Sequence, residues 1–140
     1  MNREIKFRAW NIVTKKMIDL KKITPLALNM DTDGLFLPFS DGLPLMQFTG
    51  MKDLNGKEIY EGDIVKWDDH SKGKYWRVAE VFYDNDEMMF SFRIIKCINC
   101  DLKKGYVFDG NFMLRGENPS KELEITGNIY ENEELLKIKT

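Results

Sequence analysis

The sequence predicts an all-β protein. Apolar and polar residues alternate in several short runs, the 12% of aromatic residues gather in these runs, and glycine or Asn-Gly turn signals separate them. Aromatic and β-branched side chains favour a pleated sheet over a helix. At 140 residues the chain is long enough for one domain with its own core. We therefore expect a single domain over residues 1–140.

The N-terminal part predicts a hairpin followed by a loop-rich arm. Residues 4–10 alternate, with Ile5, Phe7 and Ala9 on one side and charged residues opposite, which is typical of a half-buried strand. Residues 16–20 can return beside it. Three prolines and two glycines interrupt residues 23–44, so this segment reads as an arm with brief strands. The N-terminal strands and arm together span residues 1–50.

The densest turn signals lie in the middle of the chain. Met46 and Phe48 are expected to face the core at the end of a strand. Asn55 and Gly56 are expected to supply the positive φ angles of a tight turn. Gly62 then frees the backbone before another alternating run at residues 63–67.

The second half predicts short strands that form a barrel-like unit over residues 58–131. Residues 74–83 are largely apolar on both faces, which indicates a central or strongly curved strand, and residues 84–86 form a hairpin turn before a strand at 88–94. Further short strands are expected at 106–108, 112–114 and 122–130, with a bulge at Gly127. Asn132 can cap a short C-terminal helix.

Four strings identify the chain as similar to the YopX family: residues 6–10 (KFRAW), 47–53 (QFTGMKD), 55–65 (NGKEIYEGDIV) and 127–132 (GNIYEN). The resemblance implies an all-β fold, a phage or prophage origin and self-association. It implies no activity, so no catalytic residue carries over. We interpret the motif residues as structural: Gln47, Gly50, Asp53, Gly56, Gly62, Asp63, Gly127, Asn128 and Tyr130. Residues 61–65 also resemble the opening of SH3-like barrels, which suggests an SH3-like half but no function.

One alternative function is binding of single-stranded nucleic acid. Small barrels stack bases on exposed aromatic side chains beside basic ones, and the candidates here are Lys66, Trp67, Lys74, Tyr75 and Arg77. The competing interpretation places these aromatic side chains in the core. We favour it, because a net charge of −2 provides no overall attraction for nucleic acid.

A second alternative is metal or redox chemistry at Cys97 and Cys100. Their C-x-x-C spacing allows two thiolates to bind one metal ion, but a structural zinc site needs four ligands and the chain offers one histidine besides acids. The pair is expected in a loop rather than at a helix N-terminus, where a redox pair belongs. We favour ordinary free thiols and expect no cofactor.

No catalytic constellation stands out. His70 lies in a polar loop, no G-x-S-x-G nucleophile elbow occurs, and no glycine-rich phosphate loop occurs. Asp63 is expected to accept backbone hydrogen bonds at a strand entry. The acidic turn at residues 84–87 lacks the calcium-loop pattern.

The leading hypothesis is therefore a non-enzymatic binding protein in the cytoplasm of a bacterial host. No apolar run approaches the roughly 20 residues of a membrane helix, and the N-terminus lacks the apolar centre of a signal peptide. The expected partners are further copies of the chain and an unknown phage or host protein. The strand from Ile5 to Trp10 is the expected oligomer contact, because an open sheet edge invites pairing.

Overall fold

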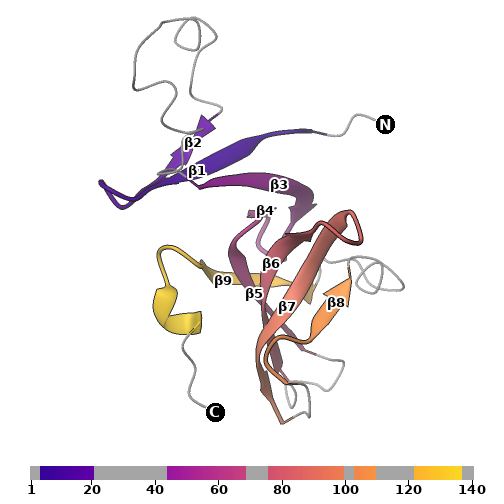
Figure 1. Ribbon diagram of the computed structural model, residues 1–140. Helices are drawn as coiled ribbons and strands as arrows, with labels where there is room; N and C mark the ends of the chain where they lie inside the picture. The colour runs from indigo at the N-terminus through magenta and orange to yellow at the C-terminus, as the bar shows by residue number, and fades with distance from the viewer. Residues whose placement is uncertain (1–3, 21–43, 69–75, 100–102, 110–121, 137–140) are drawn as a thin grey trace, which may run out of the picture.

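The computed structural model describes residues 4–20, 44–68, 76–99, 103–109 and 122–136. These form nine strands in two antiparallel sheets, followed by one short 3-10 helix (Figure 1). The predicted all-β class is confirmed. Within these residues, no helix has the length and apolar character needed to cross a membrane.

The N-terminal sheet has the strand order β2-β1-β3-β4. Its strands are β1 (Phe7–Asn11), β2 (Lys16–Asp19), β3 (Leu45–Lys52) and β4 (Glu58–Tyr60). Strand β1 pairs with β2 on one side and with β3 on the other. The prediction that Ile5 to Trp10 offers an open edge is therefore wrong, and among the described strands the edges of this sheet are β2 and β4.

The C-terminal sheet curls into a half-barrel and has the order β8-β7-β6-β5-β9. Its strands are β5 (Asp63–Asp68), β6 (Trp76–Asp84), β7 (Met89–Ile98), β8 (Val107–Asp109) and β9 (Glu124–Asn128). As predicted, β6 is central, because it pairs with both β5 and β7. The predicted C-terminal helix is the single 3-10 turn η3 (Glu133–Leu136).

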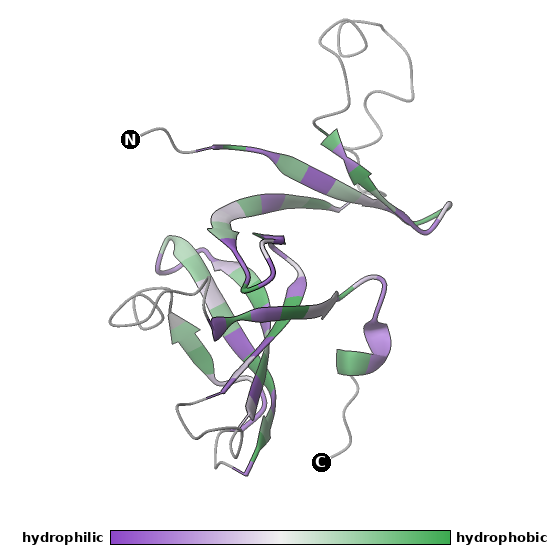
Figure 2. Ribbon diagram, turned by 180° about the vertical axis from the view of Figure 1, so that it is seen from behind, coloured by the Kyte–Doolittle hydropathy of each residue, from purple (hydrophilic) through white to green (hydrophobic). Residues whose placement is uncertain are grey.

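The main hydrophobic core lies inside the curled sheet. Its buried members are Ile59, Val65, Trp67, Ala79, Val81, Phe92, Ile94, Phe108 and Leu123. All except Ile59 and Leu123 come from the strands of the C-terminal sheet, and Figure 2 shows the alternation of apolar and polar residues along them. The register of β5 and β9 shifts between Ile64, which pairs with Gly127, and Val65, which pairs with Ile125. The predicted bulge at Gly127 is confirmed.

Three local predictions are wrong. Asn55 does not adopt a positive φ; Gly56 alone does in that turn, at 82°, since Asp53 N–H bonds to the Lys57 carbonyl and closes a longer loop. Cys97 lies within strand β7 rather than in a loop. The division of residues 4–10 into one apolar and one charged face also fails, because Lys6, Ala9 and Trp10 are all buried while Ile5 is exposed.

Several predictions lie outside the described residues. They concern most of the arm at 23–44, the loop with His70, and the short strand at 112–114.

Candidate functional site

Three of the four sequence motifs, at residues 6–10, 55–65 and 127–132, meet where the two sheets join. Strand β1 supplies Arg8, strands β4 and β5 supply Tyr60 and Asp63, and the end of β9 supplies Asn128. We call this region the motif junction.

A buried ion pair lies at the centre of the motif junction. Arg8 Nη2 donates to Asp63 Oδ1 at 2.6 Å, and the Tyr60 N–H donates to Asp63 Oδ2 at 2.8 Å. The guanidinium carbon of Arg8 also lies 4.6 Å from the centre of the Tyr60 ring. Burial raises the pKa of Asp63 above its ordinary value, although the charge of Arg8 opposes this shift. The ion pair therefore compensates a cost of burial rather than adding a large net stabilisation.

A second buried carboxylate ties the β3–β4 loop to β9. Asp53 accepts the N–H groups of Asn55 and Lys57 on Oδ1, each at 2.9 Å, and that of Ile125 on Oδ2 at 3.0 Å. Burial acts to raise the pKa of Asp53. The three backbone hydrogen bonds, with a contribution from the charge of Lys57, nevertheless hold this pKa below its ordinary value.

The turn after β9 is held by two asparagines. Asn128 Oδ1 accepts the N–H groups of Tyr130 and Glu131, at 3.0 and 2.8 Å. Asn132 Oδ1 accepts the Asn128 N–H at 3.2 Å. A Cβ atom at Gly127 would lie 2.4 Å from Asn132 Oδ1, so only glycine fits beneath this side chain.

Gly62 is restricted in a similar way. Its φ is 85°, and a Cβ atom would lie 3.1 Å from Met46 Sδ. Gln47 and Gly50 both lie on β3; the Gln47 N–H donates to Glu61 Oε1 at 2.9 Å. These contacts support the structural interpretation of the motif residues.

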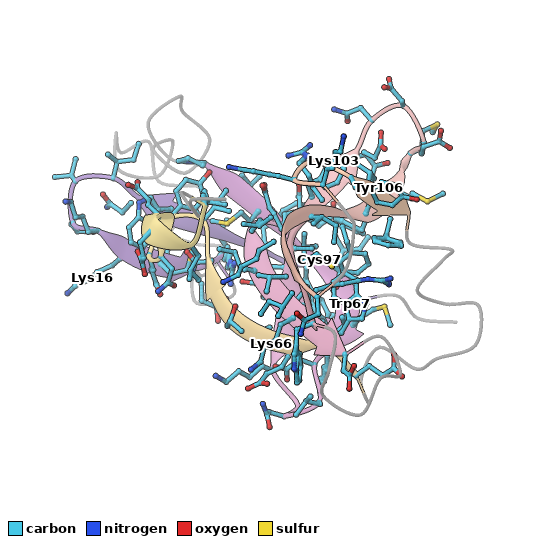
Figure 3. The ribbon with its side chains drawn as sticks, turned by 90° about the horizontal axis from the view of Figure 1, so that it is seen from below. Lys16, Lys66, Trp67, Cys97, Lys103 and Tyr106 are labelled. Carbon is cyan, nitrogen blue, oxygen red and sulfur yellow. The ribbon has the colours of Figure 1, made fainter. Side chains whose placement is uncertain are left out.

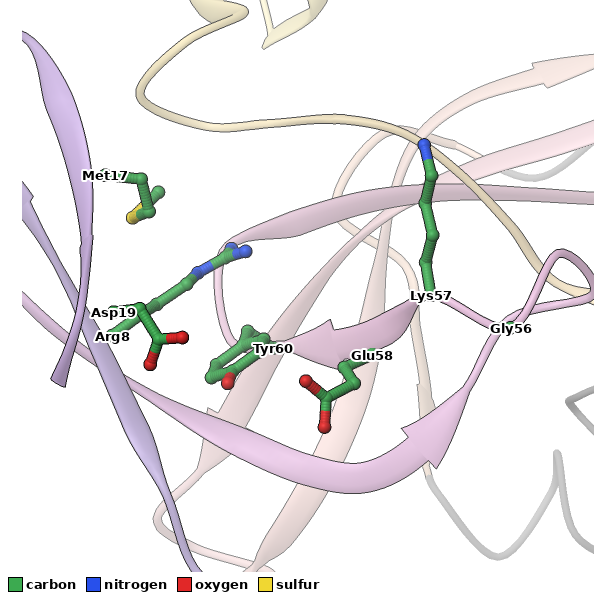
Figure 4. Close-up of a pocket in the computed structure, with 7 residues that line it drawn as sticks. All are labelled: Arg8, Met17, Asp19, Gly56, Lys57, Glu58 and Tyr60. Atoms are coloured by element: carbon green, nitrogen blue, oxygen red, sulfur yellow. The ribbon is translucent and has the colours of Figure 1, made fainter. Parts of the chain in front are cut away.

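A polar hollow of about 420 Å³ opens beside the motif junction. Figure 4 shows the residues around it: Arg8, Met17, Asp19, Gly56, Lys57, Glu58 and Tyr60. Both signs of charge line the hollow, and Glu58 is already paired with the buried Lys6. The hollow therefore has no dominant charge that would select an anion or a cation.

A second hollow, of about 470 Å³, lies at the side of the molecule where the β1–β2 hairpin approaches η3. The rings of Trp10 and Tyr130 stack there at 5.8 Å between centroids and 17° between planes. The other lining residues are Ile12, Lys15, Glu131, Glu133 and Glu134. Burial raises the pKa of Tyr130, and the charges of Glu80 and Glu61 raise it further. We call this hollow the aromatic–acidic groove.

The described candidate nucleic-acid residues, which are Lys66, Trp67 and Arg77, do not form one surface. Trp67 is only 3% exposed and packs edge-on against Phe92 and Phe108, each at 6.0 Å between ring centroids, so it cannot stack on a base. Trp67 lies opposite Arg77 in the pairing of β5 with β6. Lys66 directly precedes Trp67 on β5, so its side chain lies on the other face of the sheet from Trp67 (Figure 3).

The remaining contacts of these residues are with the protein itself. Lys66 Nζ lies 3.5 Å from Glu124 Oε2, and the Arg77 guanidinium carbon lies 4.9 Å from the Phe108 ring centre. Lys74 and Tyr75 lie outside the described residues.

The cysteine prediction needs one correction. Cys97 is disulfide-bonded, so the expected free thiol is wrong for this residue, and a bonded sulfur is not a thiolate ligand. Cys100 lies outside the described residues. Over the part of the chain that is described, no group of three or more His, Cys, Asp or Glu side chains is placed to hold a metal ion.

The fold and the motif junction define a class of protein: two antiparallel sheets joined by buried carboxylates that bind backbone N–H groups and an arginine. The chain belongs to the YopX family, since the family model described as YopX protein matches residues 6–137. The chain is also similar to protein EF1440 from Enterococcus faecalis, whose crystal structure aligns with a TM-score of 0.52 and 25% sequence identity. The alignment covers 97% of this chain and 100% of that one. Among curated proteins, no match was found.

Sequence reasoning did not select Arg8, Trp10 or Lys57 as site residues. Arg8 and Trp10 lie on the charged side of the first predicted strand, which the alternation pattern assigns to solvent. A useful signal was nevertheless present, because a tryptophan on the polar side of a strand carries a large apolar ring that another element can cover.

Proposed function

We propose that this YopX-family chain is a non-enzymatic binding protein that self-associates. The proposal includes a phage or prophage origin and a place in the cytoplasm of the bacterial host, where a phage or host protein is the further partner. One observation carries the self-association: at the tip of the β1–β2 hairpin, Val13 is 89% exposed and Ile12 is 52% exposed. Neighbouring apolar side chains left in water favour contact with another protein surface.

The contacts of the buried carboxylates support a non-enzymatic role. Asp53 is occupied by three backbone N–H groups, and Asp63 by Arg8 and one backbone N–H. A general acid or base must reach a substrate proton. Both carboxylates instead fix the path of their own chain.

The mass in solution tests the proposal. Light scattering after size exclusion, at micromolar protein, is expected to give a multiple of the 16.5 kDa chain mass. A monomeric mass over that concentration range would remove self-association from the proposed function.

A further inference from the structure

We infer that two copies of the chain associate about a two-fold axis, with the hairpin tip of each copy seated in the aromatic–acidic groove of the other. The hairpin tip is Ile12, Val13, Lys15 and Lys16. The inference rests on the proposed self-association and names the surface that carries it.

The groove offers a negatively charged rim around an aromatic floor. Glu131, Glu133 and Glu134 are exposed and line the groove with Trp10 and Tyr130. Across the described part of the chain, none of these glutamates forms an ion pair. Uncompensated carboxylates beside stacked aromatic rings favour a ligand with an apolar body and ammonium groups.

The hairpin tip has that chemistry. Ile12 and Val13 are exposed apolar residues, and Lys15 and Lys16 follow them with exposed side chains. The tip is also ordered in advance, because Asn11 Oδ1 accepts the N–H groups of Val13 at 2.9 Å and Thr14 at 3.1 Å. A fixed loop loses less conformational entropy on binding than a mobile one.

The position of the tip argues for a second copy rather than an unrelated basic peptide. Ile12 and Lys15 line the groove themselves, and the hairpin and η3 lie on the same side of the molecule (Figures 1 and 3). Basic and acidic areas therefore adjoin within a single patch. A two-fold rotation about the middle of such a patch brings each area against its opposite, which is the self-complementarity that an isologous contact requires.

Exchanging the charges tests the inference. One variant carries Lys15→Glu and Lys16→Glu, and the other carries Glu133→Lys and Glu134→Lys. Each variant alone places like charges in contact twice, so its mass by analytical ultracentrifugation is expected to fall to half that of the wild type or less. Mixing the two variants pairs opposite charges at both contacts, and the wild-type mass is expected to return. Unchanged masses of the separate variants, or a mixture that does not reassemble, would overturn the inference.

Two control variants have matched charge changes on other surfaces. They are Lys96→Glu with Lys103→Glu, and Asp86→Lys with Glu87→Lys, all at exposed positions that belong neither to the tip nor to the lining of the groove. Both are expected to keep the wild-type mass. Val13→Ser gives a second test without a charge change and is expected to weaken association at least tenfold, whereas Met88→Ser, at another exposed turn, is expected to leave it unchanged. Equal association constants for Val13→Ser and the wild type would contradict the inference.

The outcomes separate the two proposals. A monomeric wild type removes the proposed self-association. A wild type that assembles together with all of its variants removes only the tip-and-groove contact.

Discussion

The two sheets are stabilised in different ways. The C-terminal sheet encloses an apolar core in which Val65, Ala79 and Ile94 are at most 1% exposed. The N-terminal sheet instead turns Lys6 and Arg8 inward, and both side chains are held by carboxylates and aromatic rings. Buried charges require their partners in place. The C-terminal sheet thus contributes most members of the main core, whereas the N-terminal sheet also depends on its ion pairs, one of which joins Arg8 to Asp63 of the other sheet.

Exposed apolar residues occur on both sheets. Ile12, Val13 and Leu45 belong to the N-terminal sheet or its hairpin turn, and Tyr83, Met88, Ile98, Tyr106 and Val107 belong to the C-terminal sheet or its turns. Exposure alone therefore does not distinguish the two sheets, but Ile12 also lines the aromatic–acidic groove.

The largest expected effect is in the core of the C-terminal sheet. Trp67→Ala removes a buried ring that contacts Phe92 and Phe108, and we expect a loss of about 3–5 kcal/mol in the free energy of unfolding. Urea denaturation followed by circular dichroism measures it. A loss below about 1 kcal/mol would contradict the assignment of the main core to this sheet.

Arg8→Met tests how the N-terminal sheet is held. It leaves Asp63 buried without its cation, and we expect a loss of about 3 kcal/mol. Adding Asp63→Asn is expected to restore most of that loss, because the amide oxygen can still accept the Tyr60 N–H without a charge. If the double variant were as unstable as the sum of the two single variants, the ion pair would not be the coupling element.

The loss caused by Arg8→Met also depends on pH. The pKa of Asp63 in the folded protein is raised above 3.8, its ordinary value. Protonation of Asp63 therefore contributes its full stabilisation of the fold below pH 3.8, and this stabilisation is lost as pH rises through the folded-state pKa. The deficit of Arg8→Met relative to the wild type is therefore expected to be smallest in acid and to grow as pH rises. Urea denaturation at a series of pH values measures this trend.

Asp53 is expected to show the opposite pH dependence. Its pKa is held below 3.8, so its contribution is present above that value and is lost as pH falls through the folded-state pKa. Asp53→Asn keeps the shape but weakens acceptance of three N–H groups, and we expect a loss of about 2 kcal/mol near neutral pH. The difference from the wild type, measured by urea denaturation, should shrink on acidification; a constant difference would contradict the assigned role of the charge.

Two glycines provide a smaller and better matched test. Gly56 and Gly62 have φ angles of 82° and 85°, but only at Gly62 would a Cβ atom meet another residue. Gly56→Ala is expected to cost about 1 kcal/mol for the left-handed backbone. Gly62→Ala is expected to cost more, because Met46 must also move. Thermal unfolding of both variants compares them directly, and equal losses would show that the packing between Gly62 and Met46 is unimportant.

The smallest expected effect on stability is at the hairpin tip. Val13→Ser alters a side chain that is 89% exposed, so the free energy of unfolding of the monomer should change by no more than about 0.5 kcal/mol. Chemical denaturation at a concentration too low for association measures it. A larger loss would show that Val13 packs within its own subunit.

The sequence was sufficient for the strands whose patterns are local. The apolar faces of β6 and the bulge at Gly127 are each encoded by a few neighbouring residues. The turn after β6 was also predicted, although it spans residues 85–88 rather than 84–86, and β7 begins at Met89. The pairing of Arg8 with Asp63 is not, because these residues are 55 positions apart and their approach depends on how the two sheets join.

Alternation was also misleading where a polar side chain is buried. Ser91 alternates with the apolar Phe90 and Phe92, a pattern that assigns it to the polar face of the strand, yet it is fully buried. Period-two patterns divide a strand into two faces but do not reveal which face another sheet will cover. For the same reason the pattern did not predict that Arg8 and Trp10 are covered, because the residues that contact them, Asp63 and Tyr130, come much later in the sequence.

The stack of Trp10 on Tyr130 has a consequence for the order of folding. During synthesis the β1–β2 hairpin emerges early. The side chain of Arg8 finds its partner only when Asp63 has been synthesised, and the ring of Trp10 only when Tyr130 has been synthesised. The β6–β7 hairpin pairs with β5, which precedes it in the chain, so these three strands can form before Tyr130 has been synthesised. A nascent chain that ends before Tyr130 is therefore expected to protect the amides of β6 and β7 from hydrogen exchange while those of β1 still exchange freely.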